Sequence, residues 1–165
     1  MAENVILKEY RTDKYSRRGF RNKKAAEENT KRFVEDHDIK HGGLKLPVGL
    51  MSGGNQQKLL VAREIDGEPA LIIAAYPVRG LDIGATEAIR NILTEESRKG
   101  TSVLFISEEL EDIFKMCDRV GVLCDGELIG IRRIADTDFD EIGRMMSGER
   151  TDDGEAAGKA GDRDA

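Results

Sequence analysis

The stretch that decides the fold is Leu50-Met51-Ser52-Gly53-Gly54-Asn55-Gln56-Gln57-Lys58-Leu59-Leu60-Val61-Ala62. Its two adjacent glycines carry no Cβ, so the backbone there can come close to a bound anion. The residues that follow have helix-forming composition over about 53–65, and Ser52 stands where it can cap that helix. Free N–H groups and the positive end of the helix would then point at whatever lies before Gly53. The sequence therefore predicts an anion site, most naturally for phosphate.

Length and composition bound the class of protein. The chain has 165 residues, of which 35% are charged, and no Trp, which predicts one soluble domain with a real core. No apolar run approaches the ~20 residues of a membrane span, and no apolar stretch follows a basic head at the N-terminus. Cys117 and Cys124 do not form a C-x-x-C pair, which favours a reduced, cytosolic compartment.

The charge is uneven along the chain. The net charge is −6, yet basic residues dominate from Lys8 to Arg32, where Tyr10, Tyr15 and Phe20 are interleaved. Such a segment could suit RNA, but a solvated helical surface is the favoured interpretation. We therefore expect no nucleic-acid partner.

Hydrophobic periodicity predicts an alternation of helices and strands. Helices are expected over residues 3–10, 23–38, 53–65, 84–99, 109–116 and 139–146, with a loop over 11–22. Strands are expected over 70–75 and 102–106, both fully buried, and over 120–124 and 127–131, joined by the hairpin signal Asp125-Gly126. This order predicts an α/β fold: a mostly parallel sheet with helices on its faces and a C-terminal antiparallel hairpin.

A second motif follows the first expected strand: Pro77-Val78-Arg79-Gly80-Leu81-Asp82-Ile83-Gly84-Ala85. Together with the opening stretch it resembles the ATP-binding-cassette (ABC) ATPases, in the branch that imports simple sugars and nucleosides. The resemblance runs from about Glu3 to Met146. It implies a partial P-loop NTPase fold, with a helical-subdomain segment at 1–50 and the C-terminal part of the ATPase core at 51–147. Residues 148–165 hold Gly, Ala and charge without an apolar anchor, so we expect a disordered acidic tail.

The departures from the family pattern remove its catalytic chemistry. The family's Mg²⁺-holding Asp falls on Ala75, its water-polarising Glu on Tyr76, and its phosphate-sensing His on Glu108. A phenol keeps its proton until about pH 10, which makes it a poor general base. The Walker A loop, G-x-x-x-x-G-K-[ST], is absent, because Gly158-Lys159 lacks both the spacing and the hydroxyl. We expect no catalytic residue, no metal ligand and no ATP turnover by this chain alone.

The stretch Leu50–Ala62 resembles the signature motif of the family, and in the family each ATP lies between the Walker A loop of one domain and the signature motif of another. The resemblance thus implies that Ser52, Gly53, Gly54 and Gln56 face ATP held, with Mg²⁺, mainly by a partner, and that Asp82 lies across the dimer seam. The implied partners are another ABC ATPase domain or an N-terminal ATPase fragment, and transmembrane permease subunits. The implied place is cytoplasmic, peripheral to the inner face of the cell membrane.

These expectations describe a fragment of an importer's ATP-binding subunit that contributes half of a composite ATP site. The alternatives are a non-enzymatic interaction or regulatory module, or a truncated remnant of such an ATPase. His37 and His41 form a separate candidate site, because they have the i, i+4 spacing of a zinc-binding pair. However, Gly42-Gly43 follows at once and no third zinc ligand is evident. Surface histidines near a helix end are favoured there.

Overall fold

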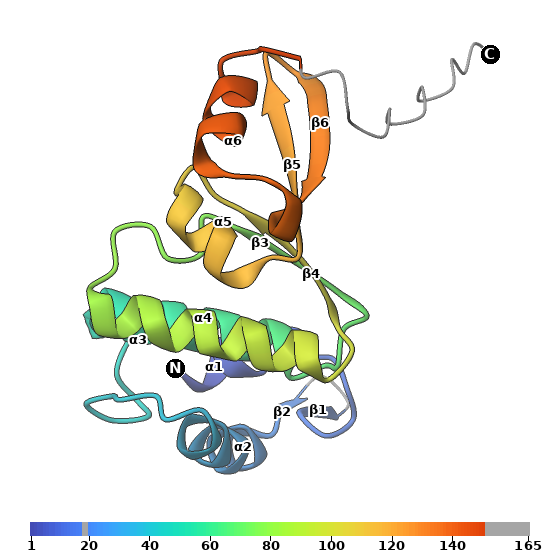
Figure 1. Cartoon of the computed structure of the whole chain (residues 1–165). Coiled ribbons are helices and arrows are strands. Elements are labelled where there is room, and N and C mark those ends of the chain that lie inside the picture. Colours follow the sequence, from blue (N-terminus) through green and yellow to red (C-terminus); the bar gives the residue numbers. More distant parts are fainter. Residues whose placement is uncertain (18–19, 151–165) are drawn as a thin grey trace, which may run out of the picture. The chain divides into compact units, whose positions relative to one another are not determined.

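The computed structural model describes residues 1–17 and 20–150, whose course is drawn in Figure 1. The chain divides into two compact units, Met1–Ile106 and a second that starts at Ser107. Within the described residues, every helix is too short or too polar to cross a membrane. Most of the expected disordered tail, from residue 151 onward, lies outside the described residues, as does the Gly158-Lys159 pair.

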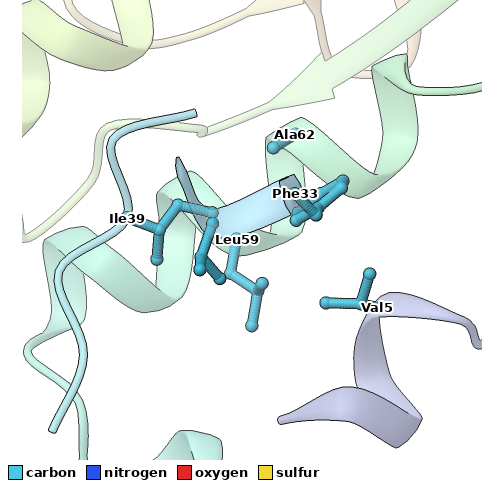
Figure 2. Close-up of a cluster of buried hydrophobic side chains, with 6 residues drawn as sticks. Val5, Phe33, Ile39, Leu59 and Ala62 are labelled. Atoms are coloured by element: carbon cyan, nitrogen blue, oxygen red, sulfur yellow. The ribbon is translucent and has the colours of Figure 1, made fainter. Parts of the chain in front are cut away.

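Three helices of the first unit meet in one apolar cluster, drawn in Figure 2. They are α1 (Ala2–Val5), α2 (Lys23–Asp36) and α3 (Gly53–Ile65). The buried members of the cluster are Val5, Phe33, Val34, Ile39, Leu59 and Ala62. Burying a large apolar side chain stabilises a fold by ~1.5–3 kcal/mol, so this cluster fixes α3 against α2 and against the segment that leaves α2.

The N-terminal expectations are confirmed in part. The helix expected over 23–38 is α2, and Asn22 caps it by accepting a hydrogen bond from the Ala25 N–H at 3.1 Å. The helix expected over 3–10 ends already at Val5. The expected loop over 11–22 contains a small antiparallel hairpin, β1 (Ser16–Arg17) and β2 (Phe20–Arg21). Strands of two residues are too short to show an alternating pattern in the sequence.

The middle of the chain forms a parallel β–α–β unit, as predicted. Its elements are β3 (Leu71–Ala75), α4 (Ile83–Arg98) and β4 (Ser102–Ile106). The two strands pair in register from Leu71 with Ser102 to Ala75 with Ile106. Helix α4 packs against both α3 and β4, so α4 lies on one face of this sheet.

The expectation that both strands are fully buried is wrong. On the helix-facing side Ile72 and Ala74 are each only 9% exposed, whereas Leu71 is 53%, Ile73 63% and Leu104 50% exposed on the opposite side. An apolar run predicts burial on both faces only when a layer of protein covers each of them. Within the first unit, Met1–Ile106, helix α4 covers one face of the two strands.

The second unit is a hairpin with a helix packed on it. Its elements are α5 (Leu110–Met116), β5 (Arg119–Cys124), β6 (Glu127–Arg133), a 3₁₀ turn (Ile134–Asp136) and α6 (Phe139–Met146). The predicted antiparallel hairpin is confirmed: Asp125 and Gly126 both take positive φ, 50° and 81°, as a two-residue turn requires. Helix α6 packs on both strands and buries Ile142 and Met145 completely.

Candidate functional site

The start of α3 is the first component of the candidate site. Ser52 occupies the N-cap position with extended backbone angles (φ −61°, ψ 151°), and Gly53 is the first helical residue. The Ser52 side chain makes no capping hydrogen bond, so the expected side-chain cap is wrong. Its Oγ instead accepts a hydrogen bond from Nδ2 of Asn55 at 2.8 Å. The first-turn N–H groups, which have no partner inside a helix, are therefore left without a side-chain acceptor from the cap.

Polar side chains fasten this turn to the segment after α2. Oδ1 of Asn55 accepts a hydrogen bond from the backbone N–H of Lys40 at 2.9 Å. One turn along α3, Nζ of Lys58 lies 3.5 Å from Oδ2 of Asp38 and donates to the Asp38 carbonyl at 3.3 Å. The side chain of Gln56 donates to the carbonyl of Met51 at 2.8 Å, which closes the turn from the other side. The backbone around Ser52 and Gly53 is held in place while both residues stay exposed.

Gly54 lies at a tight contact between α3 and α4. A Cβ at Gly54 would stand 2.6 Å from the Cβ of Ala85 and 4.0 Å from Oδ2 of Asp82. At Gly53 the nearest atom would be Cδ2 of Leu81 at 3.9 Å, which is ordinary contact. The lack of a side chain is thus required by helix packing at Gly54, whereas Gly53 has room for one. The structure brings the two sequence motifs together at this point.

Asp82 supplies the only carboxylate among the predicted site residues. It caps α4, because its Oδ1 accepts the Ala85 N–H at 2.8 Å, as the sequence predicted. Its side chain is exposed beside the start of α3. The site therefore combines N–H donors that favour an anion with a negative charge that opposes one.

The start of α3 is exposed at Ser52 and Gly53. Exposed first-turn N–H groups are suitable donors to phosphate oxygens. Across residues 1–17 and 20–150, no three His, Cys, Asp or Glu side chains cluster in a way that could hold a metal ion. The described residues thus expose Ser52 and Gly53 at the start of α3 and contain no cluster of three potential metal-ligating side chains.

The end of β3 carries no carboxylate side chain at Ala75 or Tyr76. Ala75 closes β3, and Tyr76 follows with a left-handed backbone (φ 51°) whose N–H donates to the Ile106 carbonyl at 2.9 Å. The guanidinium of Arg79 lies 5.8 Å from the centre of the Tyr76 ring. Glu108 is exposed and belongs to the second unit. A methyl group and a phenol paired with a cation offer neither a metal ligand nor a base for water.

The two histidines do not share a helix face. Helix α2 ends at Asp36, and His37 is its C-cap, with its ring 4.7 Å from that of Phe33. Nδ1 of His41, beyond the helix, accepts a hydrogen bond from the Gly43 N–H at 3.1 Å. Each imidazole is therefore engaged locally.

Sequence reasoning missed Asn55, Lys58 and Ala85 as residues that build the site. Asn55 and Lys58 lie inside the stretch Leu50–Ala62, and Ala85 ends the second motif. Their position in these motifs was the feature of the sequence that could have indicated a role in the site. Their roles depend on contacts with Lys40, Asp38 and Gly54, and a single sequence does not show which residues meet.

Comparisons with known proteins identify the family. Over 148 residues, 90% of its length, the chain is 38% identical to the nucleoside import ATP-binding protein NupA of Lactococcus lactis. Over 160 residues it is 36% identical to the guanosine import ATP-binding protein NupO of Bacillus subtilis. The chain belongs to the ABC ATP-binding proteins, in their sugar and nucleoside import branch. It spans 29% and 31% of the lengths of these two relatives. No family model matches the chain.

Solved structures show the same fold. The dimeric ATP-binding cassette MJ0796, described with ADP and Pi, superposes with a TM-score of 0.58 at 20% identity, over 79% of this chain and 53% of that one. An ABC transporter in an inward-facing conformation gives a TM-score of 0.69 at 15% identity, over 89% and 57% of the two chains. The predicted partial ABC ATPase fold is thereby confirmed.

Proposed function

We propose that this chain contributes the signature half of a composite ATP site in an ABC importer for simple sugars or nucleosides. Its relatives are named as nucleoside, guanosine, glucose and ribose import ATP-binding proteins, which supports that range of solutes. The ATP and Mg²⁺ would be held mainly by a partner, either another ABC ATPase domain or an N-terminal ATPase fragment. Transmembrane permease subunits complete the assembly, and this chain would lie in the cytoplasm, peripheral to the inner face of the cell membrane.

One observation carries this proposal: the turn before α3 is rigidly held, exposed and without a side-chain cap. Asn55 donates to the Ser52 hydroxyl at 2.8 Å and accepts from the Lys40 N–H at 2.9 Å, and Gln56 donates to the Met51 carbonyl at 2.8 Å. Ser52 and Gly53 themselves remain exposed. Donors fixed before a ligand arrives lose little entropy when they bind it. The adjacent Asp82 weakens the binding of a free anion, so the site favours a phosphate presented by a second polypeptide.

Catalytic incompetence is the second part of the proposal. Ala75 and Tyr76 stand where the family has carboxylates, and the left-handed Tyr76 is tied to β4 by its backbone N–H. Neither side chain can hold Mg²⁺ or deprotonate water at neutral pH. The chain would therefore complete a partner's site and add no hydrolysis of its own.

The test uses an ATP-holding partner, such as a purified ATPase domain of the Lactococcus lactis nucleoside import protein made unable to hydrolyse ATP. We expect association with this chain, measured by light scattering, to require ATP. Gly53→Ala should weaken it, because a methyl group would keep phosphate away from the backbone. Gly67→Ala is the matched control, since a Cβ at Gly67 would meet nothing within 4 Å.

A second measurement addresses catalysis directly. The chain alone, given Mg-ATP, should turn over far more slowly than the enzyme range of about 1 s⁻¹ and above. Turnover in that range would refute the incompetence. Association that ignores ATP, or that Gly53→Ala leaves unchanged, would refute the half-site and favour a non-enzymatic module or a remnant.

A further inference from the structure

A hollow of about 410 Å³ lies between helix α2 and the loop that precedes β1, and both walls belong to the first unit. It is lined by Lys14 from the loop and by Ala25, Glu28, Asn29, Lys31 and Arg32 from α2. Apart from Lys31, the α2 residues recur every three or four positions, which places them on one face of the helix. Small-molecule sites have volumes of about 300–1,000 Å³, so the hollow can hold a small ligand.

The hollow carries positive charge in a chain whose net charge is −6. Its three cations, Lys14, Lys31 and Arg32, stand against the one carboxylate of Glu28, which leaves a net charge of +2. Glu28 lies 3.9 Å from Nζ of Lys24, so its charge is shared with a cation outside the hollow. Across residues 1–17 and 20–150, none of the three lining cations forms an ion pair. Their combined field therefore attracts a small anion.

One amide oxygen gathers two of these cations. Oδ1 of Asn29 accepts hydrogen bonds from Nζ of Lys14 at 3.4 Å and from the guanidinium of Arg32 at 3.3 Å. Two positive groups at one neutral oxygen repel each other, and an anion that contacts both would relieve that repulsion. In the described part of the chain, Nδ2 of Asn29 donates to no residue, so the same amide can offer an N–H to the anion.

The loop that carries Lys14 is anchored in the protein interior. The next residue, Tyr15, is 1% exposed and packs with Ile6 and Ala26 in a small buried cluster. Nζ of Lys14 lies 4.8 Å from the centre of the Tyr15 ring, a distance at which a cation and an aromatic face attract each other. The ammonium group is thus held at the hollow before a ligand arrives, which lowers the entropy lost on binding.

We propose that this hollow binds a small phosphate monoester. At pH 7 such a phosphate carries a charge of about −1.5 to −2 and three strong acceptor oxygens, which match the charge and the donors of the lining. The planar fork of Arg32 can bind two of these oxygens together, and the ammonium groups of Lys14 and Lys31 act as point charges. No residue of α3 lines the hollow, so this inference goes beyond the proposed function and does not depend on it.

The test is a titration of the full 165-residue chain with glycerol 3-phosphate, followed by ¹H–¹⁵N NMR. We expect saturable shifts of the Asn29 side-chain amide with a Kd of about 1 mM or lower, and no shift with glycerol. Arg32→Ala and Lys31→Ala should each weaken binding about 5-fold or more, because each removes a charged donor to phosphate. Lys23→Ala is the matched control, because Lys23 is an exposed cation of the same helix and does not line the hollow.

Soluble esters and lipid headgroups share this phosphate chemistry, and a second arm separates them. Phosphatidylcholine vesicles with and without phosphatidate are sedimented together with the chain. Sedimentation that requires phosphatidate and that Arg32→Ala weakens would support the phosphate site with a lipid as its source. Shifts with glycerol 3-phosphate without such sedimentation would support the site with a soluble ester as its source.

Several outcomes would overturn the proposal. They are the absence of binding in both arms, binding that Arg32→Ala and Lys31→Ala leave unchanged, and an equal loss in Lys23→Ala. Circular dichroism checks that each variant is folded, so that lost binding is not mistaken for unfolding. Gly53→Ala should leave the titration unchanged, because binding that it abolished would belong to the start of α3 and would overturn the hollow without testing the ATP half-site.

Discussion

The tight contact between Gly54 in α3 and Ala85 in α4 yields a prediction that can be worked out from distances. In Gly54→Ala the new Cβ would lie 2.6 Å from the Cβ of Ala85, and Cβ atoms in proteins essentially never come within 3.0 Å of another heavy atom of this kind. Because both atoms are attached directly to helix backbones, no rotamer change relieves the clash, and the helices must move apart. Overpacking of this kind costs about 1–3 kcal/mol, and the higher helix propensity of alanine offsets at most ~1 kcal/mol.

We therefore expect Gly54→Ala to lose roughly 1–2 kcal/mol, which lowers the melting temperature by about 2–8 °C for a chain of this size. Circular dichroism and urea unfolding measure it. Gly53→Ala should not be destabilised, because its new Cβ would have 3.9 Å of space. Adding Ala85→Gly to Gly54→Ala removes the opposing methyl group, so the pair should show a favourable coupling of about 1 kcal/mol. An unchanged melting temperature for Gly54→Ala, or strict additivity of the pair, would refute the reasoning.

Three further predictions concern single side chains. Asp82→Ala removes the cap of α4 and should lower the free energy of unfolding, measured in urea, by about 0.5–2 kcal/mol. Asp82→Asn should keep most of that stability, because asparagine also caps helices. Equal losses of stability in both variants would contradict a capping role. Hydrogen bonds from Thr137 and Arg132 hold the pKa of Glu141 below its usual range, so its contribution to stability is present above about pH 4.3 and is lost as the pH falls through the lower folded value. Glu141→Gln should therefore unfold at lower urea than the parent at pH 7, and the gap should narrow below pH 4; a constant gap would count against it. Burial raises the pKa of the Cys117 thiol, so iodoacetamide at pH 7.5 should alkylate it more slowly in the folded chain than in urea, as peptide mass spectrometry can follow; equal rates would argue otherwise.

The sequence predicted the positions of most elements but not which faces of the sheet are covered. The apolar runs at β3 and β4 identified both strands, and the crossover between them identified the parallel pairing. Whether Ile73 and Leu104 are buried depends on a second layer of protein, and the pattern of a strand carries no information about that layer. The same run of residues would look identical in a complete domain.

At the site, local chemistry was predictable and tertiary contacts were not. Asp82 caps its helix as predicted, because a cap depends on residues three positions apart. Ser52 does not, because Asn55 engages its hydroxyl and also reaches Lys40. The interpretation of Gly54 needed the position of α4, since an anion site and a helix contact both favour glycine.

The double use of Asn55 has a mechanical consequence. Its amide oxygen accepts from the N–H of Lys40, after α2, and its amide nitrogen donates to the hydroxyl of Ser52, before α3. The two segments are thus linked through a single planar group. A displacement of the Lys40 backbone would therefore displace Ser52 directly, because both bond the same side-chain amide. A protein that binds the loop after α2 could thus shift the position at which the proposed phosphate would bind.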